Sequence, residues 1–230
     1  MAYSKNDIVQ VTIEDIGVTG EGIGKIDGYT LFVKDTVIGD VVEVKIMKAK
    51  KNYGYARLMN IITPSKDRVT PECNIARQCG GCQLQAMSYA AQLKYKQKLV
   101  SDNLQRIGGL TEGVDYEMCD ILGMYTPFRY RNKAQYPVGE DKDGNIIMGF
   151  YAGHTHSIIP CDDCLLGDEN NSVILTAVKQ WMKDYRVRAY NENIHKGTLR
   201  HILIRTGFHT DEIMVCLVTK KMLRKEAADG

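Results

Sequence analysis

The sequence is poor in proline and tryptophan and has no long apolar run. Its 230 residues contain five prolines and one tryptophan. No stretch approaches the roughly 18 apolar residues of a membrane-spanning helix, and the first residues lack the apolar segment of a signal peptide. These absences predict a cytoplasmic protein that does not associate with membranes.

The chain also lacks a charge excess of either sign. Thirty Lys and Arg residues against 28 Asp and Glu residues give a formal net charge of +2. This balance excludes a purely electrostatic nucleic-acid binder, so any binding of RNA must come from a local patch. The composition, 44% hydrophobic and 25% charged, is that of a folded globular protein. The length allows one large domain or two smaller ones.

Residues 1–64 are predicted to form a small β-barrel. Apolar stretches typical of strands lie at residues 8–13, 29–33, 41–46 and 55–62. The pair Asp27-Gly28 indicates a hairpin turn between two of them. About five short strands in roughly 60 residues fit a closed barrel of the OB type. The glycines at 20, 22 and 24 are interpreted as barrel turns, since a cofactor-binding glycine loop would open a helix.

The remaining residues predict a loop, a helix and an α+β domain. Residues 65–87 form the loop, and residues 88–120 contain a helix over 88–107 and a connection. Residues 121–230 form the α+β domain. Its antiparallel strands are expected at residues 130–138, 146–151, 199–205 and 212–219, with a helix over 174–185 and no element over 220–230. The fold class is therefore α+β.

Three cysteines in the loop give the strongest chemical signal. They follow the pattern Cys73-x5-Cys79-x2-Cys82, with two glycines inside the second spacing. Thiolates bind soft metals, and the glycines allow the backbone to wrap closely around an ion or cluster. Cysteines in the reducing cytoplasm rarely form disulfides, so this pattern predicts a metal site. The isolated Cys119 and Cys216 are interpreted as core packing.

A fourth ligand must come from the pair Cys161 and Cys164, and two kinds of site fit. A zinc site would combine this pair with Cys79 and Cys82. An iron–sulfur cluster would use Cys73, Cys79, Cys82 and one cysteine of the later pair. The residues alone leave both open.

The segment Pro71-x-Cys73, followed by Cys79-Gly-Gly-Cys82-x2-Gln85, resembles the signature of bacterial RNA (uracil-5-)-methyltransferases that carry a [4Fe-4S] cluster, members of which modify 23S ribosomal RNA. The first 63 residues resemble the TRAM domain of that family, an RNA-binding OB-type barrel. Segments 130–133, 149–151, 156–159 and 199–205 resemble its central domain. The resemblance implies Cys73, Cys79, Cys82 and Cys164 as cluster ligands. In the family, apolar positions follow the last cysteine ligand. Cys164, which two leucines follow, fits this pattern better than Cys161.

The same resemblance implies S-adenosylmethionine as the cofactor of the complete enzyme, RNA as its partner, ribosomal RNA above all, and a monomer. The family's catalytic half, with a nucleophilic cysteine in a proline-rich loop, has no counterpart here. No catalytic or cofactor-binding residues are therefore expected in this segment, which alone should be inactive. The alternative is a stand-alone RNA-binding module with a structural metal site.

Two basic patches are candidates for RNA contact. The first combines cations with aromatic rings that can stack on bases; its members are Lys45, Lys48, Lys50, Lys51, Tyr53 and Tyr55. A solvated hairpin tip is the competing interpretation. In the second, Arg129, Arg131 and Lys133 alternate along an expected strand and would share one face. These three could equally pair with acidic neighbours.

Overall fold

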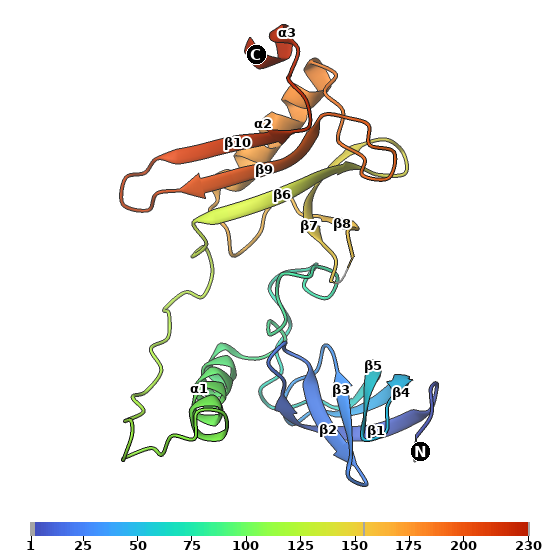
Figure 1. The fold of residues 1–230 in the computed structure, drawn as a ribbon, viewed down its shortest axis with the longest axis vertical. Coiled ribbons are helices and arrows are strands. Elements are labelled where there is room, and N and C mark those ends of the chain that lie inside the picture. Colours follow the sequence, from blue (N-terminus) through green and yellow to red (C-terminus); the bar gives the residue numbers. More distant parts are fainter. Residues whose placement is uncertain (1–2, 154, 230) are drawn as a thin grey trace. The chain divides into compact units, whose positions relative to one another are not determined.

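The computed structural model describes residues 3–153 and 155–229, which form two compact units (Figure 1). The barrel unit contains residues up to Asn74 together with Cys82–Met124, and the sheet unit contains Ile75–Gly81 and the residues from Tyr125 onward. No helix in the described part of the chain is long and apolar enough to cross a membrane.

Five strands close the predicted barrel. They are β1 (Ile8–Ile16), β2 (Gly22–Ile26), β3 (Tyr29–Val33), β4 (Val41–Ala49) and β5 (Tyr53–Thr63). The strand order is β1-β2-β3-β5-β4, with β4 pairing back to β1 and a parallel contact between β3 and β5. Inward-facing side chains such as Leu31, Val42 and Ile46 are fully buried and form its core. The barrel expected from the sequence is confirmed.

Strand β2 corrects the interpretation of the glycine run as turns. Gly22 and Gly24 lie inside the strand, paired with both β1 and β3. A side chain at Gly24 would place its Cβ 2.4 Å from the carbonyl oxygen of Thr12. Gly24 is therefore needed because the neighbouring backbone approaches too closely for any side chain, whereas a side chain at Gly22 would meet those of Thr36 and Ile13.

Helix α1 (Tyr89–Arg106) packs on the barrel within the same unit. Its N-cap is Ser88, whose hydroxyl accepts a hydrogen bond from the N–H of Ala91. The helix bounds match the prediction, but the buried side chain is that of Tyr95. The Tyr95 hydroxyl donates to the carbonyl of Gly17 over 2.8 Å and so ties the helix to the end of β1.

The sheet unit is an antiparallel sheet covered on one face by a helix (Figure 1). Its strands are β6 (Lys133–Glu140), β7 (Ile146–Tyr151), β8 (Ile158–Pro160), β9 (Leu199–Thr206) and β10 (Ile213–Thr219), in the order β10-β9-β6-β7-β8. Helix α2 (Asn170–Asp184) buries Leu175, Val178 and Met182 against Tyr136 and Ile202. The predicted α+β class is confirmed.

The opposite face of the sheet is exposed. Two expectations about this part of the chain are corrected: the packing of Cys119 and Cys216 in a core, and the lack of an element after residue 220. Residues directly opposite each other on neighbouring strands share a face, so Cys216 of edge strand β10 lies beside Leu203 on the uncovered side. Cys216 is exposed, as is Cys119, and neither packs in a core. A short helix, α3 (Lys225–Asp229), also forms where no element was expected, and the Trp181 indole donates to the carbonyl of Ala227 within it.

Candidate nucleic-acid interface and cysteine loops

An exposed aromatic cluster occupies the outer surface of the barrel. Tyr53 and Tyr55 alternate outward along β5, and Phe32 joins them from the neighbouring strand β3. The three ring centroids lie 5.6 to 5.9 Å apart in tilted and edge-to-face arrangements. Phe32 was not predicted, because only the parallel pairing of β3 with β5 brings it beside the tyrosines. Rings held in this way can stack on the bases of a single strand.

Cations surround this aromatic cluster. Lys48 lies opposite Tyr55 in the β4–β5 pairing, and Lys45 lies opposite Arg57. Lys50 and Lys51 follow in the turn that joins the two strands. Ion pairs among the described residues involve none of these lysines. Their ammonium groups are therefore free to meet phosphates.

The hairpin that carries these residues is fixed from inside the barrel. The buried Tyr29 hydroxyl donates to the carbonyl of Tyr53 over 2.6 Å and accepts from the N–H of Lys50 over 3.2 Å. It thus holds both sides of the turn. This anchoring argues against a freely solvated hairpin tip, since the aromatic cluster stands on a constrained backbone.

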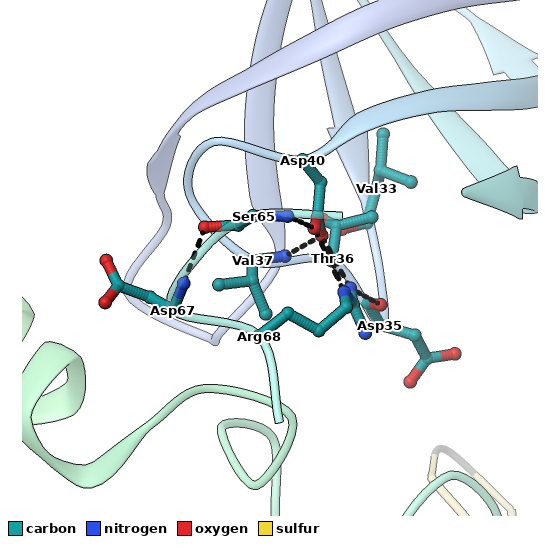
Figure 2. A network of polar contacts seen from close by, with 8 residues as sticks. All are labelled: Val33, Asp35, Thr36, Val37, Asp40, Ser65, Asp67 and Arg68. Carbon is teal, nitrogen blue, oxygen red and sulfur yellow. Dashed lines mark hydrogen bonds and ion pairs between the residues drawn. The ribbon is translucent and has the colours of Figure 1, made fainter. Parts of the chain in front are cut away.

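A buried ion pair fixes the end of the barrel where β5 runs into the cysteine loop (Figure 2). Asp40 has no exposed surface, and its Oδ2 lies 2.5 Å from Nη2 of Arg68. The same carboxylate accepts from the N–H groups of Val37 and Ser65. Arg68 donates further to the carbonyl of Asp35. One side chain therefore joins the β3–β4 loop to the segment after β5.

The charge of Asp40 depends on these partners. Burial by itself would raise the pKa of the Asp40 carboxyl, but the hydrogen bonds from Arg68, Ser65 and Val37 outweigh it and hold the pKa below its usual value. Asp40 is therefore ionised at neutral pH. The network is structural, because its groups satisfy one another inside the unit.

The second predicted basic patch does not form as expected. Strand β6 begins only at Lys133, and Arg129 has a left-handed backbone with φ of 56°. The N–H groups of Arg129 and Arg131 pair instead with the carbonyls of Leu165 and Leu166. The three cations therefore do not alternate along one strand. Lys133 does lie on the uncovered face of the sheet.

Arg129 holds the loop that contains the later cysteine pair. Its guanidinium makes two hydrogen bonds to the Asp163 carboxylate, at 2.6 and 2.7 Å. It also donates to the carbonyls of Cys164 and Gly167. Arg129 is thus a positioning residue for Cys164. This role was not predicted because the contacts join residues 34 or more positions apart.

Cys164 lies in surroundings that favour its thiolate. A hydrogen bond from Cys161 lowers the pKa of the Cys164 thiol, burial opposes this, and the N–H groups of Leu166 and Gly167 lower it further, to about 6. Cys161 is the more buried of the two. The Tyr136 hydroxyl is also buried nearby, and burial together with the charges of Cys164 and Cys161 raises its pKa, which a hydrogen bond with Asn171 only partly offsets. The later cysteine pair therefore favours formation of a thiolate, and Cys164 as the ligand stays a prediction.

The three earlier cysteines lie on a backbone held by neighbouring groups. The N–H of Cys73 donates to Oε1 of Gln85 over 3.3 Å, which gives the last residue of the sequence motif a role. Within the sheet unit, Gly80 donates to the carbonyl of Tyr151, and a side chain at Gly80 would meet that oxygen at 3.0 Å.

The proposed cluster ligands are divided between the two units. Cys73 and Cys82 belong to the barrel unit, and Cys79 and Cys164 to the sheet unit. Among the described residues, no three His, Cys, Asp or Glu side chains form a group that could hold a metal ion. The cluster stays a prediction.

The fold defines a closed OB-type barrel followed by an α+β unit. Residues 5–59 match the TRAM domain family, as the resemblance of the first 63 residues implies. The chain is 47% identical over 224 residues to an uncharacterized RNA methyltransferase of Clostridium tetani, covering 96% of this chain and 48% of the relative. A second such protein, from Halalkalibacterium halodurans, is 48% identical over 217 residues, covering 94% and 46%. The chain spans about half the length of the curated relatives it matches.

A solved structure shares the fold of both units. It is the Pyrococcus abyssi tRNA (uracil-54, C5)-methyltransferase in complex with S-adenosyl-L-homocysteine, with a TM-score of 0.69. The likeness covers 96% of this chain and 48% of that one, at 24% sequence identity. The barrel and the antiparallel α+β unit are thus an arrangement already known from an RNA-modifying enzyme.

Proposed function

We propose that this chain is the RNA-recognition part of an S-adenosylmethionine-dependent RNA (uracil-5-)-methyltransferase with 23S ribosomal RNA as its substrate. The observation that carries the proposal is the exposed cluster of Phe32, Tyr53 and Tyr55 beside unpaired lysines, on a barrel that matches the TRAM family. Similarity to RNA methyltransferases over 96% of the chain supports the enzyme class. The choice of uracil C5 and 23S RNA is supported by the motif around Cys79 and Cys82.

Binding by the barrel follows from stacking and charge. Unpaired bases of an RNA loop would stack on Tyr53 and Tyr55, while Lys48 and its neighbours in the turn meet the phosphates. Tyr29 keeps the strands in place, so little conformational freedom is lost on binding. This part of the protein selects single-stranded RNA and leaves the chemistry to another part.

A [4Fe-4S] cluster held by Cys73, Cys79, Cys82 and Cys164 belongs to the proposal. Its support from the sheet unit is the chemistry of the donor set. Cys164 favours the thiolate form, and the charges of Cys164 and Cys161 raise the pKa of the nearby buried Tyr136 hydroxyl, which keeps it protonated as a hydrogen-bond donor. Addition of a cysteine to uracil and methyl transfer consume no electrons. The cluster's role is then structural, positioning the RNA-facing residues.

The cofactor site is expected outside this segment. The chain covers 48% of its Clostridium tetani relative, and its glycine run at residues 20–24 continues into strand β2 rather than a helix. We expect calorimetry to detect no binding of S-adenosylmethionine by the 230-residue chain. Micromolar binding of S-adenosylmethionine by this chain would contradict a cofactor site outside it.

The decisive experiment maps 5-methyluridine in cells that lack the full-length gene. Mass spectrometry of RNA fragments should show one 5-methyluridine lost from 23S ribosomal RNA and restored by the intact gene. A complementing gene with Tyr55→Ala should restore it only in part. Loss from transfer RNA alone would overturn the proposed substrate. An unchanged pattern in both RNAs would favour a stand-alone RNA-binding module.

A further inference from the structure

The sheet unit contains a cavity that none of the preceding roles uses. It has a volume of about 320 Å³ and lies between the ends of β6 and β7 and the segment that precedes β9. Its polar and aromatic lining includes Tyr151, His156, Tyr190, Glu192 and Arg200. A cavity of this size, at the low end of ligand sites, suits one planar ring system rather than a large cofactor.

One side of the cavity offers a flat stacking surface. The imidazole of His156 stacks on the ring of Tyr151, with centroids 5.2 Å apart and planes 24° apart. The Tyr151 ring lies beneath it, while 77% of the His156 side chain remains exposed. The inner partner thus holds the imidazole flat, and its outer face is accessible. Histidine is among the side chains on which unpaired RNA bases stack.

A second requirement of a ring-binding site is a group that hydrogen-bonds to the edge of the bound ring. The fixed carboxylate of Glu192 meets this requirement. Nδ1 of His156 lies 3.0 Å from Oε2 of Glu192, and Nη2 of Arg200 lies 3.8 Å from Oε1. The hydrogen bond from His156 lowers the pKa of the Glu192 carboxyl, and the Arg200 charge lowers it further. Glu192 is therefore ionised and accepts hydrogen bonds only.

The wall that carries Glu192 is itself held in place. The guanidinium of Arg200 lies 4.8 Å from the ring centroid of Tyr190, and the ammonium of Lys220 lies 5.2 Å from it. The Tyr190 hydroxyl is 2.9 Å from Nδ1 of His195. These cations also offset the repulsion between Glu192 and an approaching phosphate. The carboxylate is therefore presented in a defined position.

RNA is a polyanion, so a carboxylate that binds it needs a compensating interaction. Its two acceptor oxygens favour a base with two adjacent N–H donors. Among the four RNA bases only guanine presents two neighbouring N–H groups, N1–H and N2–H, on its Watson–Crick edge. Adenine and cytosine offer their exocyclic amine alone, and uracil offers N3–H alone. We propose that this cavity binds one unpaired guanine of the RNA, stacked on His156 and recognised by Glu192. The inference rests on the proposed RNA-binding function.

Fluorescence anisotropy with the complete chain tests this site. The probes are fluorescein-labelled uridine decamers that carry one central guanosine, inosine or adenosine, or none. We expect the guanosine decamer to bind about tenfold more tightly than the others, because two hydrogen bonds to a charged group are gained. Glu192→Gln should abolish this preference. His156→Ala should weaken binding of the guanosine decamer about fivefold or more, and His156→Phe should restore it through stacking.

Matched variants separate this site from general effects. Glu226→Gln and His209→Ala change exposed residues of the sheet unit outside the cavity and should leave every affinity unchanged. Equal affinity for all four decamers, or a guanosine preference that survives Glu192→Gln, would overturn the guanine site while RNA binding by the barrel stands. A preference for adenosine would overturn the choice of base. Failure to bind any decamer would refute both the site and the proposed function.

Discussion

The lysines beside the barrel's aromatic cluster and several cations of the sheet unit differ in their partners. On the barrel, the lysines beside the aromatic cluster take part in no ion pair among the described residues. In the sheet unit, Arg129 pairs with Asp163, Lys179 with Asp162, and Arg200 with Glu192. Free ammonium groups attract any polyanion, whereas a paired guanidinium mainly fixes its neighbours. The barrel is therefore suited to phosphate-driven affinity and the sheet unit to selectivity.

The two units also differ in their strand edges. Closure leaves the barrel without a free edge. The sheet has an uncovered face and an exposed edge strand, β10, on which Ile213, Met214 and Val215 are at least 40% exposed. The barrel is a self-contained module, while the sheet presents surface to its surroundings.

The largest expected effect concerns the cysteines that both units contribute. In anaerobically purified protein we expect about four irons per chain, and Cys73→Ala in the barrel unit or Cys164→Ala in the sheet unit should remove nearly all of them. Each loss follows because a cluster needs all four thiolates. Iron analysis and the visible absorption spectrum give the measurement.

Each unit supplies an exposed cysteine as a control. Cys119→Ala and Cys216→Ala should retain full iron. Loss of iron in these variants as well would show that the ligand assignment is wrong, and stoichiometric zinc without iron would favour the four-cysteine zinc site. Loss of iron in Cys161→Ala, with retention of iron in Cys164→Ala, would show that Cys161 is the fourth ligand in place of Cys164.

The next largest effect should separate a buried ion pair from an exposed one. Arg68→Met leaves the Asp40 charge buried in the barrel unit, and removing one partner of such a pair costs about 3 kcal/mol or more. In the sheet unit, Arg188→Met removes an exposed pair with Glu140 and should not change stability measurably. Calorimetry should show a lower unfolding temperature only for Arg68→Met. Equal shifts would contradict the structural role of this network.

The pH dependence of the same variant has a defined sign. Because the folded-state pKa of Asp40 is below its usual 3.8, the unfolded chain binds this proton more tightly. The stabilisation is fully present above about pH 5 and is lost as the pH falls through 3.8 toward the folded-state pKa. Without Arg68, burial should raise this pKa instead. Acidification toward 3.8 would then restore part of the variant's lost stability.

Much of the barrel unit could be predicted because its signals are local. Alternating apolar residues marked four strands, and Ser88 and Gly108 marked the ends of α1. Strand β2 was not predicted because glycine occupies two of its five positions, so its apolar residues do not alternate with polar ones. Tyr95 was not predicted as the buried side chain of α1, since it is selected by a hydroxyl contact with Gly17. Such long-range contacts leave no periodic pattern in the sequence.

The sheet unit shows the same limit more strongly. The spacing of Cys161 and Cys164 was visible, but the role of Arg129 depends on a loop folded back onto it. The cavity beside Glu192 was missed because its lining comes from five separate segments between residues 138 and 201. Only the stack of His156 on Tyr151 has a local signal, an aromatic residue five positions before a histidine.

A smaller effect should test the aromatic cluster of the barrel. Tyr55→Ala removes a surface on which one base stacks, which is worth about 1–3 kcal/mol, and should weaken binding of a uridine decamer about fivefold or more. Tyr125→Ala removes a fully exposed tyrosine of the sheet unit and should leave the affinity unchanged. Anisotropy titrations compare the two. Equal weakening by both variants would argue against a defined stacking site.

The smallest effect lies in the salt dependence, and it tests the difference in cation use directly. Each phosphate contact on a single strand contributes about 0.7 to the slope of log affinity against log salt concentration. Lys48→Gln should therefore reduce the slope by about this amount, because its ammonium group is free to meet a phosphate. Lys179→Gln removes a cation already 2.8 Å from Asp162 and should leave the slope unchanged. A reduced slope in both variants would mean that Lys179 contacts a phosphate despite its ion pair with Asp162.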